Sequence, residues 1–319
     1  MKLFTISACL VLAGLLPARA IVFWNLDNSA NLDDPGTGAP WDSVAKVINA
    51  GNTSLSGSAI YLGNGYLLTA DHVTMGTNSF SHVTFDGTNT FEIDPTFKAG
   101  TRDLGIQVAG GADLAVFRLT IEPVGVPAVS LLTSTNEVFG GEATMIGWGV
   151  GRDPATPLES TNVTWGNAST SDLRWGLNAP LDALTVNYLS YSMEALRTIA
   201  GADGVTFNPD GLGDAEGAAT LYDSGSALFQ KIDDVWFLIG VATAVQNGGF
   251  SIYGDDKVSG PGGGDANYYA RISTYEQDIV AVIPEPGTVS LLAAGAVALG
   301  LAALRRRRRQ ESRSPSGHC

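Results

Sequence analysis

The chain has 319 residues, with 18 lysine and arginine residues against 32 aspartate and glutamate residues. Without its two terminal segments, residues 1–20 and 288–319, it keeps 10 basic and 31 acidic residues, a net charge of about −21. Such a surface repels nucleic acids and anionic membranes, so neither is an expected partner. Both cysteines, Cys9 and Cys319, lie in the terminal segments, so the body of roughly 265 residues must build its core without disulfides.

Residues 1–20 have the layout of a secretory signal peptide. Lys2 precedes a short apolar run, and Ala18-Arg19-Ala20 supplies the small residues that signal peptidase requires. The alternative, a membrane anchor, is disfavoured because the run is short and contains Pro17. We therefore expect export, with residues 21–42 as an N-terminal leader.

The body is rich in glycine and in short runs that favour β-strands, such as "SAIYLG", "GYLLTA", "LAVFRLT", "EATMIGWG" and "VWFLIGVATAV". Gly63-Asn64-Gly65 lies between two of these runs and indicates a tight hairpin. This pattern predicts an all-β sandwich or a pair of barrels. Two segments have helical spacing instead: residues 189–200, a possible surface helix, and residues 270–283, a C-terminal helix.

Three polar residues stand out inside apolar or small-residue surroundings. His72 follows the apolar run "GYLLTA", and it is one of only two histidines in the body, beside His82, which we interpret as an ordinary strand residue. Asp113 enters the apolar run "ADLAVFRL", where a buried carboxylate needs a hydrogen-bond partner such as an imidazole N–H. Ser224 lies in the short loop "YDSGSALF". A serine hydrolase would require such a base, acid and nucleophile.

These segments resemble, in order, the motifs of chymotrypsin/trypsin-like serine proteases. "LLTADHV" is similar to their histidine motif, "ADLAVFRL" to their aspartate strand, "MIGWGVG" to their Gly-Trp-Gly strand and "YDSGSALF" to their nucleophile loop. "VWFLIGVATA" resembles their substrate-binding strand, and "YYARISTYEQDI" their closing segment. The resemblance covers most of residues 43–281 and implies two packed antiparallel β-barrels with a short C-terminal helix. His72, Asp113 and Ser224 would form a catalytic triad in the cleft between the barrels.

The resemblance also implies an oxyanion hole made by the backbone N–H groups of Tyr222 and Ser224. Tyr222 departs from the family pattern, because glycine normally occupies this position and adopts the required backbone conformation at little cost. A second departure is Asp71, an extra carboxylate next to His72 that we expect to strengthen the imidazole as a base. Three functional interpretations remain open: a working serine endopeptidase, an inactive protein of the same fold that serves as a matrix or binding component, and an esterase with the same triad.

The expectations about activation by N-terminal cleavage and about substrate specificity come only from the resemblance. Cleavage after Ala20 would expose Ile21, whose ammonium group would pair with Asp223; the alternative is that Ile21 merely begins a flexible leader. Ala218 and Thr243 would line the specificity pocket, and the absence of an acid at Ala218 favours a small or apolar substrate residue. No cofactor is expected. The acidic loop at residues 208–217 is a conceivable structural calcium site, but its spacing misses the EF-hand pattern.

Residues 282–309 resemble the PEP-CTERM sorting signal of Gram-negative bacteria. Pro284-Glu285-Pro286 precedes an apolar run at 288–304, which is just long enough for a transmembrane helix, and five arginines follow at 305–309. The resemblance implies transient membrane insertion, removal of the tail by an exosortase, and a location at the cell surface or in the medium. A permanent tail anchor is the alternative. Residues 310–319 would form a cytoplasmic tail. The expected partners are thus signal peptidase, an exosortase and a protein or peptide substrate.

Overall fold

The computed structural model describes residues 21–23, 27, 29–49, 51, 55–75, 80–102, 104–156, 163–200, 212–245, 251–252 and 265–283. The predicted signal peptide and the predicted sorting signal from residue 284 onwards lie outside these residues. The described part is mostly β-sheet, as the alternating apolar pattern predicts. No helix within these residues has the length and apolar character needed to span a membrane. The described part of the chain contains two α-helices, α1 (Asp71–Thr74) and α2 (Ile272–Val282), and 3-10 turns at Trp41–Ser43, Ala168–Thr170 and Gly213–Ala215.

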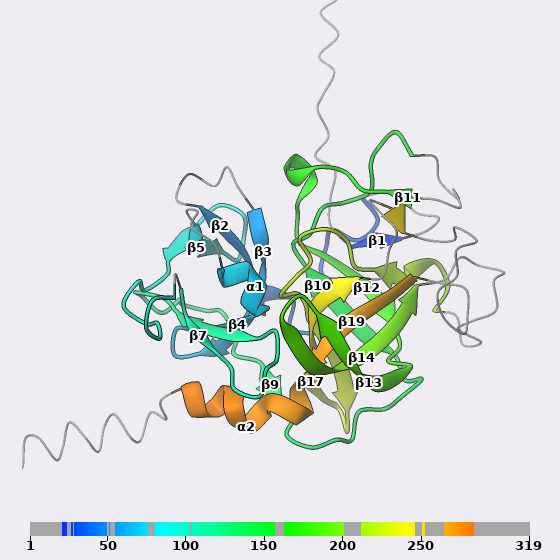
Figure 1. Ribbon diagram of the computed structural model, residues 1–319. Coiled ribbons are helices and arrows are strands. Elements are labelled where there is room, and N and C mark those ends of the chain that lie inside the picture. The colour runs from blue at the N-terminus through cyan, green and yellow to red at the C-terminus, as the bar shows by residue number, and fades with distance from the viewer. Residues whose placement is uncertain are drawn as a thin grey trace, which may run out of the picture.

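Two large sheets contain most of the described strands (Figure 1). The first contains the blue and cyan strands β2 (Val44–Asn49), β3 (Leu55–Gly63), β4 (Tyr66–Thr69), β5 (Phe80–Thr84), β6 (Thr90–Glu92), β7 (Ile106–Gln107) and β8 (Ala115–Arg118). Its strand order is β6-β5-β2-β3-β4-β8-β7. The predicted hairpin joins β3 to β4, and Asn64 and Gly65 both take left-handed backbone angles, with φ of 53° and 80°. These are the angles of a type I′ turn, whose twist matches that of the strands.

The first sheet closes on itself. The chain beyond β6 meets the end of β8 through an antiparallel bridge between Ile93 and Leu119. The backbone N–H of Asp94 donates to the Arg118 carbonyl over 2.7 Å, and that of Thr120 donates to the Glu92 carbonyl over 2.9 Å. Closure satisfies backbone groups that an open edge would leave unpaired.

The second sheet contains most of the remaining strands, in the order β12-β10-β16-β17-β19-β14-β13, with β9 parallel to β17. These strands are β9 (Ser130–Leu131), β10 (Ala143–Gly147), β12 (Arg174–Asn178), β13 (Asp182–Tyr188), β14 (Tyr191–Ala200), β16 (Ala227–Ile232), β17 (Val235–Val245) and β19 (Asp265–Arg271). Only residues 179–181 separate its edge strands β12 and β13, and the four Cα–Cα steps of such a link span at most ~14 Å. The two edges therefore lie close together, and this sheet is also curled.

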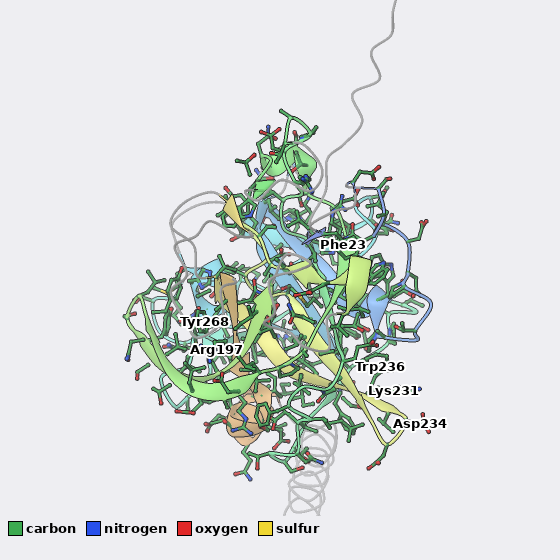
Figure 2. All side chains as sticks on the ribbon, turned by 90° about the vertical axis from the view of Figure 1, so that its right-hand side faces the viewer. Phe23, Arg197, Lys231, Asp234, Trp236 and Tyr268 are labelled. Carbon is green, nitrogen blue, oxygen red and sulfur yellow. The ribbon has the colours of Figure 1, made fainter. Side chains whose placement is uncertain are left out.

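Figure 2 shows the second sheet from its outer side. Arg197 and Tyr268 lie opposite each other on the neighbouring strands β14 and β19. Lys231, Asp234 and Trp236 mark the tip of the β16–β17 hairpin. Two short strand pairs complete the fold: β1 (Val22–Phe23) with β15 (Gly217–Ala218), and β11 (Val163–Thr164) with β18 (Ser251–Ile252).

The largest core cluster joins the two sheets. Ile60 and Leu68 of the first sheet and Ile146 and Phe229 of the second belong to this one buried cluster. Helix α2, which forms as predicted, lies along the lower edge of the molecule in Figure 1, and its buried Tyr275 belongs to the same cluster. The two halves are therefore held by a common apolar core, so residues from both can meet in a fixed geometry.

Two expectations from the sequence are wrong. Residues 191–200 form strand β14 rather than a surface helix, because this segment pairs with β13 on one side and β19 on the other. Tertiary pairing thus overrides the local helical spacing. The predicted leader does not stand apart from the domain either: Val22 pairs with Ala218, and Ile21, Val22 and Phe23 are all buried. The folded domain thus begins before residue 43.

Candidate active site

The first sheet brings His72 and Asp113 together. His72 lies in α1, directly after β4, and Asp113 lies directly before β8. Because Thr69 of β4 pairs with Ala115 of β8, the residues just beyond this pair are neighbours. The Asp113 carboxylate is fully buried, and its two oxygens bind the His72 ring Nδ1 over 2.6 Å and the His72 backbone N–H over 2.9 Å. One carboxylate therefore fixes both the position and the orientation of the imidazole.

The second sheet supplies the third residue. The Ser224 hydroxyl oxygen lies 2.7 Å from His72 Nε2, on the side of the ring opposite Asp113. Since Asp113 accepts the proton of Nδ1, the neutral ring presents an unprotonated Nε2 to the serine hydroxyl. Three residues that are 41 and 111 positions apart in the sequence thus form one chain of hydrogen bonds from a buried carboxylate to a hydroxyl.

The Ser224 loop is held by close backbone contacts with both sheets. The Ser224 carbonyl accepts the N–H of Ser58 from the first sheet over 2.8 Å, and the Gly225 N–H donates to the Ala242 carbonyl over 2.8 Å. Gly225 has a left-handed φ of 84°, and a Cβ at this position would lie 2.0 Å from the Ser58 carbonyl oxygen. Only glycine fits here, because any side chain would force the loop away from β3.

Tyr222 takes the backbone conformation that glycine would adopt. Its φ is 68°, in the left-handed region that costs an ordinary residue about 1–2 kcal/mol. The half-buried ring packs against a cluster that contains Val22, Val150 and Trp165, which offsets part of this cost. Within the described residues, the backbone N–H groups of Tyr222 and Ser224 donate no hydrogen bond, so both are available to a ligand.

Asp223 is buried between these two residues. Its carboxylate accepts hydrogen bonds from the Gly149 N–H (2.9 Å) and from the N–H (2.7 Å) and hydroxyl (3.1 Å) of Thr220. Burial raises the pKa of the Asp223 carboxyl to about 6, against the opposing effects of these donors and of the buried Arg174. Among the described residues, Ile21 is not a hydrogen-bond partner of Asp223; its carbonyl instead accepts from the Asn31 side chain. The ion pair between them requires a cleaved chain and stays a prediction.

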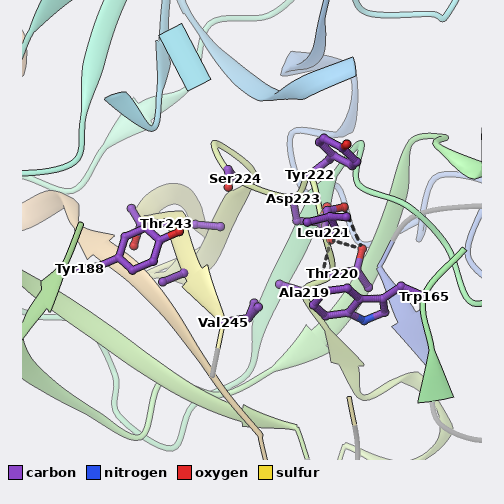
Figure 3. A pocket seen from close by; sticks show the side chains of 12 residues that line it. Trp165, Tyr188, Ala219, Thr220, Leu221, Tyr222, Asp223, Ser224, Thr243 and Val245 are labelled. Atoms are coloured by element: carbon purple, nitrogen blue, oxygen red, sulfur yellow. Dashed lines mark hydrogen bonds between the residues drawn. The ribbon is translucent and has the colours of Figure 1, made fainter. Parts of the chain in front are cut away.

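A cavity of about 310 Å³ opens beside Ser224. Figure 3 shows it between the segment Ala219–Leu221 and the strand end Thr243–Val245, with Tyr188 and Trp165 at its sides. Thr243 is among the residues that line the cavity; its role in specificity stays a prediction. Ala218, in β15, does not line the cavity: it is fully buried in an apolar cluster, and its neighbour Ala219 lines the cavity instead. Apart from Asp223, whose oxygens are engaged by backbone and hydroxyl donors, the described residues that line the cavity are uncharged.

The Asp71 carboxylate binds other partners than the imidazole. It is buried, forms an ion pair with Arg102 and accepts the Tyr191 hydroxyl over 2.9 Å, while the His72 ring Nδ1–H donates to Asp113. Tyr188, which the sequence did not single out, lies with its ring edge-on to His72 at a centroid distance of 6.0 Å. No sequence motif marks Tyr188 or Arg102, because both come from segments outside the family-like motifs.

The remaining predicted features lie elsewhere. His82 is in β5, where its Nδ1 is 2.8 Å from the Ser81 hydroxyl, and it takes no part in the site. Residues 208–211 of the acidic loop at 208–217 lie outside the described residues. Among the residues that are described, no group of three or more histidine, cysteine or acidic side chains is placed to hold a metal ion.

No protein-family model matches the chain, and no curated protein matches it. Among solved structures, the chain is similar to the HtrA-type protease AlgW with a decapeptide, at 18% identity and a TM-score of 0.45, over 72% of this chain and 52% of that one. The chain thus spans about half the length of AlgW. It is also similar to an inactive serine-to-alanine mutant of Rv3671c from M. tuberculosis, at 12% identity and a TM-score of 0.45, over 79% and 96% of the two chains.

Proposed function

We propose that this protein is an exported serine endopeptidase with the two-barrel architecture of the chymotrypsin-like proteases. The observation that carries the proposal is the continuous set of hydrogen bonds from the buried Asp113 through His72 to the Ser224 hydroxyl, at 2.6 and 2.7 Å. A serine hydroxyl becomes a nucleophile when an adjacent base accepts its proton and a third group orients that base. Ser224 supplies the hydroxyl, His72 the base and Asp113 the orienting group. Strand pairing and a constrained loop fix their positions.

The reaction follows from these positions. The Ser224 oxygen attacks the carbonyl carbon of the peptide bond, and its proton passes to His72 Nε2. Asp113 keeps the ring oriented and stabilises the imidazolium that forms. The imidazolium then gives the proton to the departing amine, which leaves an acyl ester on Ser224. A water molecule, deprotonated by the same imidazole, hydrolyses this ester and restores the serine hydroxyl.

The N–H groups of Tyr222 and Ser224 would stabilise the negative oxygen of each tetrahedral intermediate. One such donor contributes on the order of a hundredfold or more to the rate. The left-handed φ of Tyr222 supports this role, because it gives the loop the conformation that a glycine would supply. Apart from the hydrogen-bonded Asp223, the described residues that line the cavity beside Ser224 are uncharged, which favours an apolar residue on the acyl side of the scissile bond.

Export, processing and location belong to the same proposal and are supported only by the sequence of the termini. Signal peptidase would release residue 21 as the new N-terminus, and an exosortase would remove the C-terminal tail. The protein would then act at the cell surface of a Gram-negative bacterium or in its surroundings, without a cofactor.

A fluorophosphonate probe, which reacts only with an activated serine, tests the proposal. The purified exported protein should be labelled, and Ser224→Ala should abolish labelling. Ser226→Ala is the matched control: Ser226 is fully buried two residues further along, and its loss should leave labelling unchanged. Cleavage of a fluorescent casein by the wild type separates a peptidase from an esterase. A folded wild type that takes up no probe would identify an inactive protein of this fold.

A further inference from the structure

Strand β13 (Asp182–Tyr188), labelled at the lower right of Figure 1, is paired along one edge only. All seven of its residues pair with β14 on that edge. On the other edge, its backbone N–H and carbonyl groups bond to no described residue. No other described strand of four or more residues leaves a whole edge unpaired. Such an edge presents a row of donors and acceptors that another strand can bind.

The open edge of β13 lacks the features that usually keep a strand edge from pairing. Proteins protect an edge with lysine, proline or a bulge. Residues 182–188 contain no lysine, proline or glycine, and the register with β14 runs without a shift. Asp182 is the only charged residue of the strand, and its carboxylate is already paired, because Arg197 of β14 donates to it over 2.6 and 3.0 Å. The edge is therefore regular and close to neutral.

Two exposed leucines flank this edge. Leu181 lies one position before β13 and Leu189 one position after it, and their exposed fractions are 45% and 71%. Both are four positions away from Thr185, the middle residue of the strand, which is also exposed. If two copies of the strand pair in the antiparallel direction about Thr185, Leu181 of each copy lies opposite Leu189 of the other. A two-fold axis through the Thr185 pair makes this contact twice.

The remaining pairs in this register are also compatible. They put no two charges opposite each other: Leu184 with Val186, Ala183 with Asn187, and Asp182 with Tyr188. Apolar pairs directly opposite each other on adjacent strands stabilise a sheet, whereas like charges in such a pair destabilise it. The edge of β13 is therefore complementary to itself.

The acidic surface of the protein opposes this contact only weakly at the edge itself. Glu194 of β14 lies opposite Thr185 and accepts its hydroxyl over 2.5 Å. In two paired copies the two Glu194 side chains would be three strand spacings apart, about 14 Å. This exceeds the screening length of about 8 Å at physiological ionic strength. The repulsion that remains comes from the net charge of about −21, and added salt should reduce it.

We propose that two copies of this protein pair through the open edges of β13, antiparallel and centred on Thr185, and form a symmetric dimer with one sheet continuing across the interface. The occupant of the edge is a second copy of this chain, because the two exposed leucines oppose each other in the self-pairing register. The interface lies beside the candidate site, since Tyr188 at the end of the strand lines the cavity next to Ser224. The dimer does not depend on the proposed peptidase function.

Sedimentation velocity tests the dimer on the exported protein with Ser224→Ala, which removes the proposed nucleophile and so any self-cleavage. A single strand pair makes a small interface, so we expect reversible dimerisation with a Kd of about 10–100 µM, tighter at high salt than at low salt. Amide hydrogen exchange at residues 182–188 should be slower at concentrations above this Kd than below it. A protein that stays monomeric up to about ten times this Kd would overturn the proposal, whether its edge amides exchange freely or are protected by another segment of the same chain.

Charge substitutions test the register. Leu181→Lys and Leu189→Glu, each made alone, should weaken dimerisation by about tenfold or more, because each puts a charge against a leucine at two symmetric positions. The double variant should dimerise about tenfold more tightly than either single variant, because the two introduced charges are opposite in sign and face each other across the interface. Both positions are exposed, and equal melting temperatures of the diluted proteins would show that the variants fold.

Val124→Lys and Val124→Glu are the matched controls. Val124 is 99% exposed and lies between β8 and β9, so these variants change the net charge equally without touching β13. They should leave the Kd unchanged. A dimer that the Val124 variants weaken as much as the leucine variants would overturn the interface. A double variant that dimerises no more tightly than the single variants would overturn the register centred on Thr185.

Discussion

The two sheets hold their parts of the site by different means. The first places His72 and Asp113 at the ends of the paired strands β4 and β8, and side-chain hydrogen bonds complete the geometry. The second places Ser224 in a loop with left-handed residues on both sides, Tyr222 and Gly225, around the buried Asp223. Many side-chain substitutions leave the pairing of two strands intact, whereas few can be accommodated in a loop whose backbone is packed directly against a neighbouring strand. The nucleophile half of the site should therefore be the more fragile one.

The largest expected effect is that of Gly225→Ala. The added Cβ would approach the Ser58 carbonyl oxygen to 2.0 Å, so the loop must shift and carry Ser224 away from His72. A displacement of this kind costs about a hundredfold or more in rate, measured as fluorophosphonate labelling. Gly125→Ala is the control, because Gly125 has the same φ of 84° with no atom within 4 Å of its Cβ position. Equal losses in both variants would show that φ, and not the close approach, is what requires glycine.

The next prediction compares a buried cation in the second sheet with a more exposed one in the first. Arg174 is fully buried, donates to Asn31, and its charge favours the ionised form of Asp223. Arg174→Met should lower the free energy of unfolding by about 1–3 kcal/mol, because the buried Asn31 side chain loses its charged donor and the ionised Asp223 loses a favourable charge. Arg118→Met, at the more exposed Arg118–Asp94 pair, should cost about 1 kcal/mol or less. Urea unfolding of both variants measures the difference; similar costs would contradict it.

Asp223 and Asp94 should respond to pH in opposite directions. Burial raises the pKa of Asp223 to about 6, so its contribution to stability is complete below pH 4 and is lost as the pH rises to 6, by up to about 3 kcal/mol. Hydrogen bonds from Thr96 and Arg118 lower the pKa of Asp94 to about 2, so its contribution is present above pH 4 and is lost on acidification.

The measurement is the unfolding free energy of wild type minus that of Asp223→Asn, and separately of Asp94→Asn, between pH 2 and pH 7. The difference for Asp223→Asn should fall from pH 4 to pH 6 and then level off. The difference for Asp94→Asn should rise from pH 2 to pH 4. If the difference for Asp223→Asn rises with pH, the hydrogen-bond donors around Asp223 lower its pKa by more than burial raises it.

The smallest expected effect concerns Tyr222. Tyr222→Gly relieves the left-handed strain of about 1–2 kcal/mol but loses the packing of the ring, so stability and labelling rate should change little, the rate by less than about threefold. Tyr222→Ala keeps the strain and loses the packing, and its melting temperature should be the lowest of the three proteins. If Tyr222→Gly is labelled ten times faster than wild type, the tyrosine holds its N–H group in a poor position.

Several local features could be predicted because the responsible residues are neighbours in the sequence. The hairpin at Asn64-Gly65 and the helix at Ile272–Val282 both formed as expected, since turn angles and helical spacing are local properties. The segment 191–200 was misjudged because its strand partners, β13 and β19, decide its conformation. Nothing in the sequence of Ile21–Phe23 reveals that β15 will pair with this segment, so the sequence predicts a leader where the structure has strand β1.

The sequence by itself indicates the three residues of the candidate triad, because each is a polar group in an apolar or small-residue segment and these segments resemble, in order, the motifs of chymotrypsin/trypsin-like proteases. Only the tertiary structure decided that the His72 ring lies 2.6 Å from the Asp113 carboxylate and 2.7 Å from the Ser224 hydroxyl. These residues come from different sheets, and the apolar core that joins the sheets is made by residues far apart in the sequence. It also decided that Tyr222 adopts the conformation of a glycine, and that the Asp71 carboxylate binds Arg102 and Tyr191 instead of facing the imidazole. A residue's identity fixes which bonds it can form, whereas the packing of distant segments selects which of them it does form.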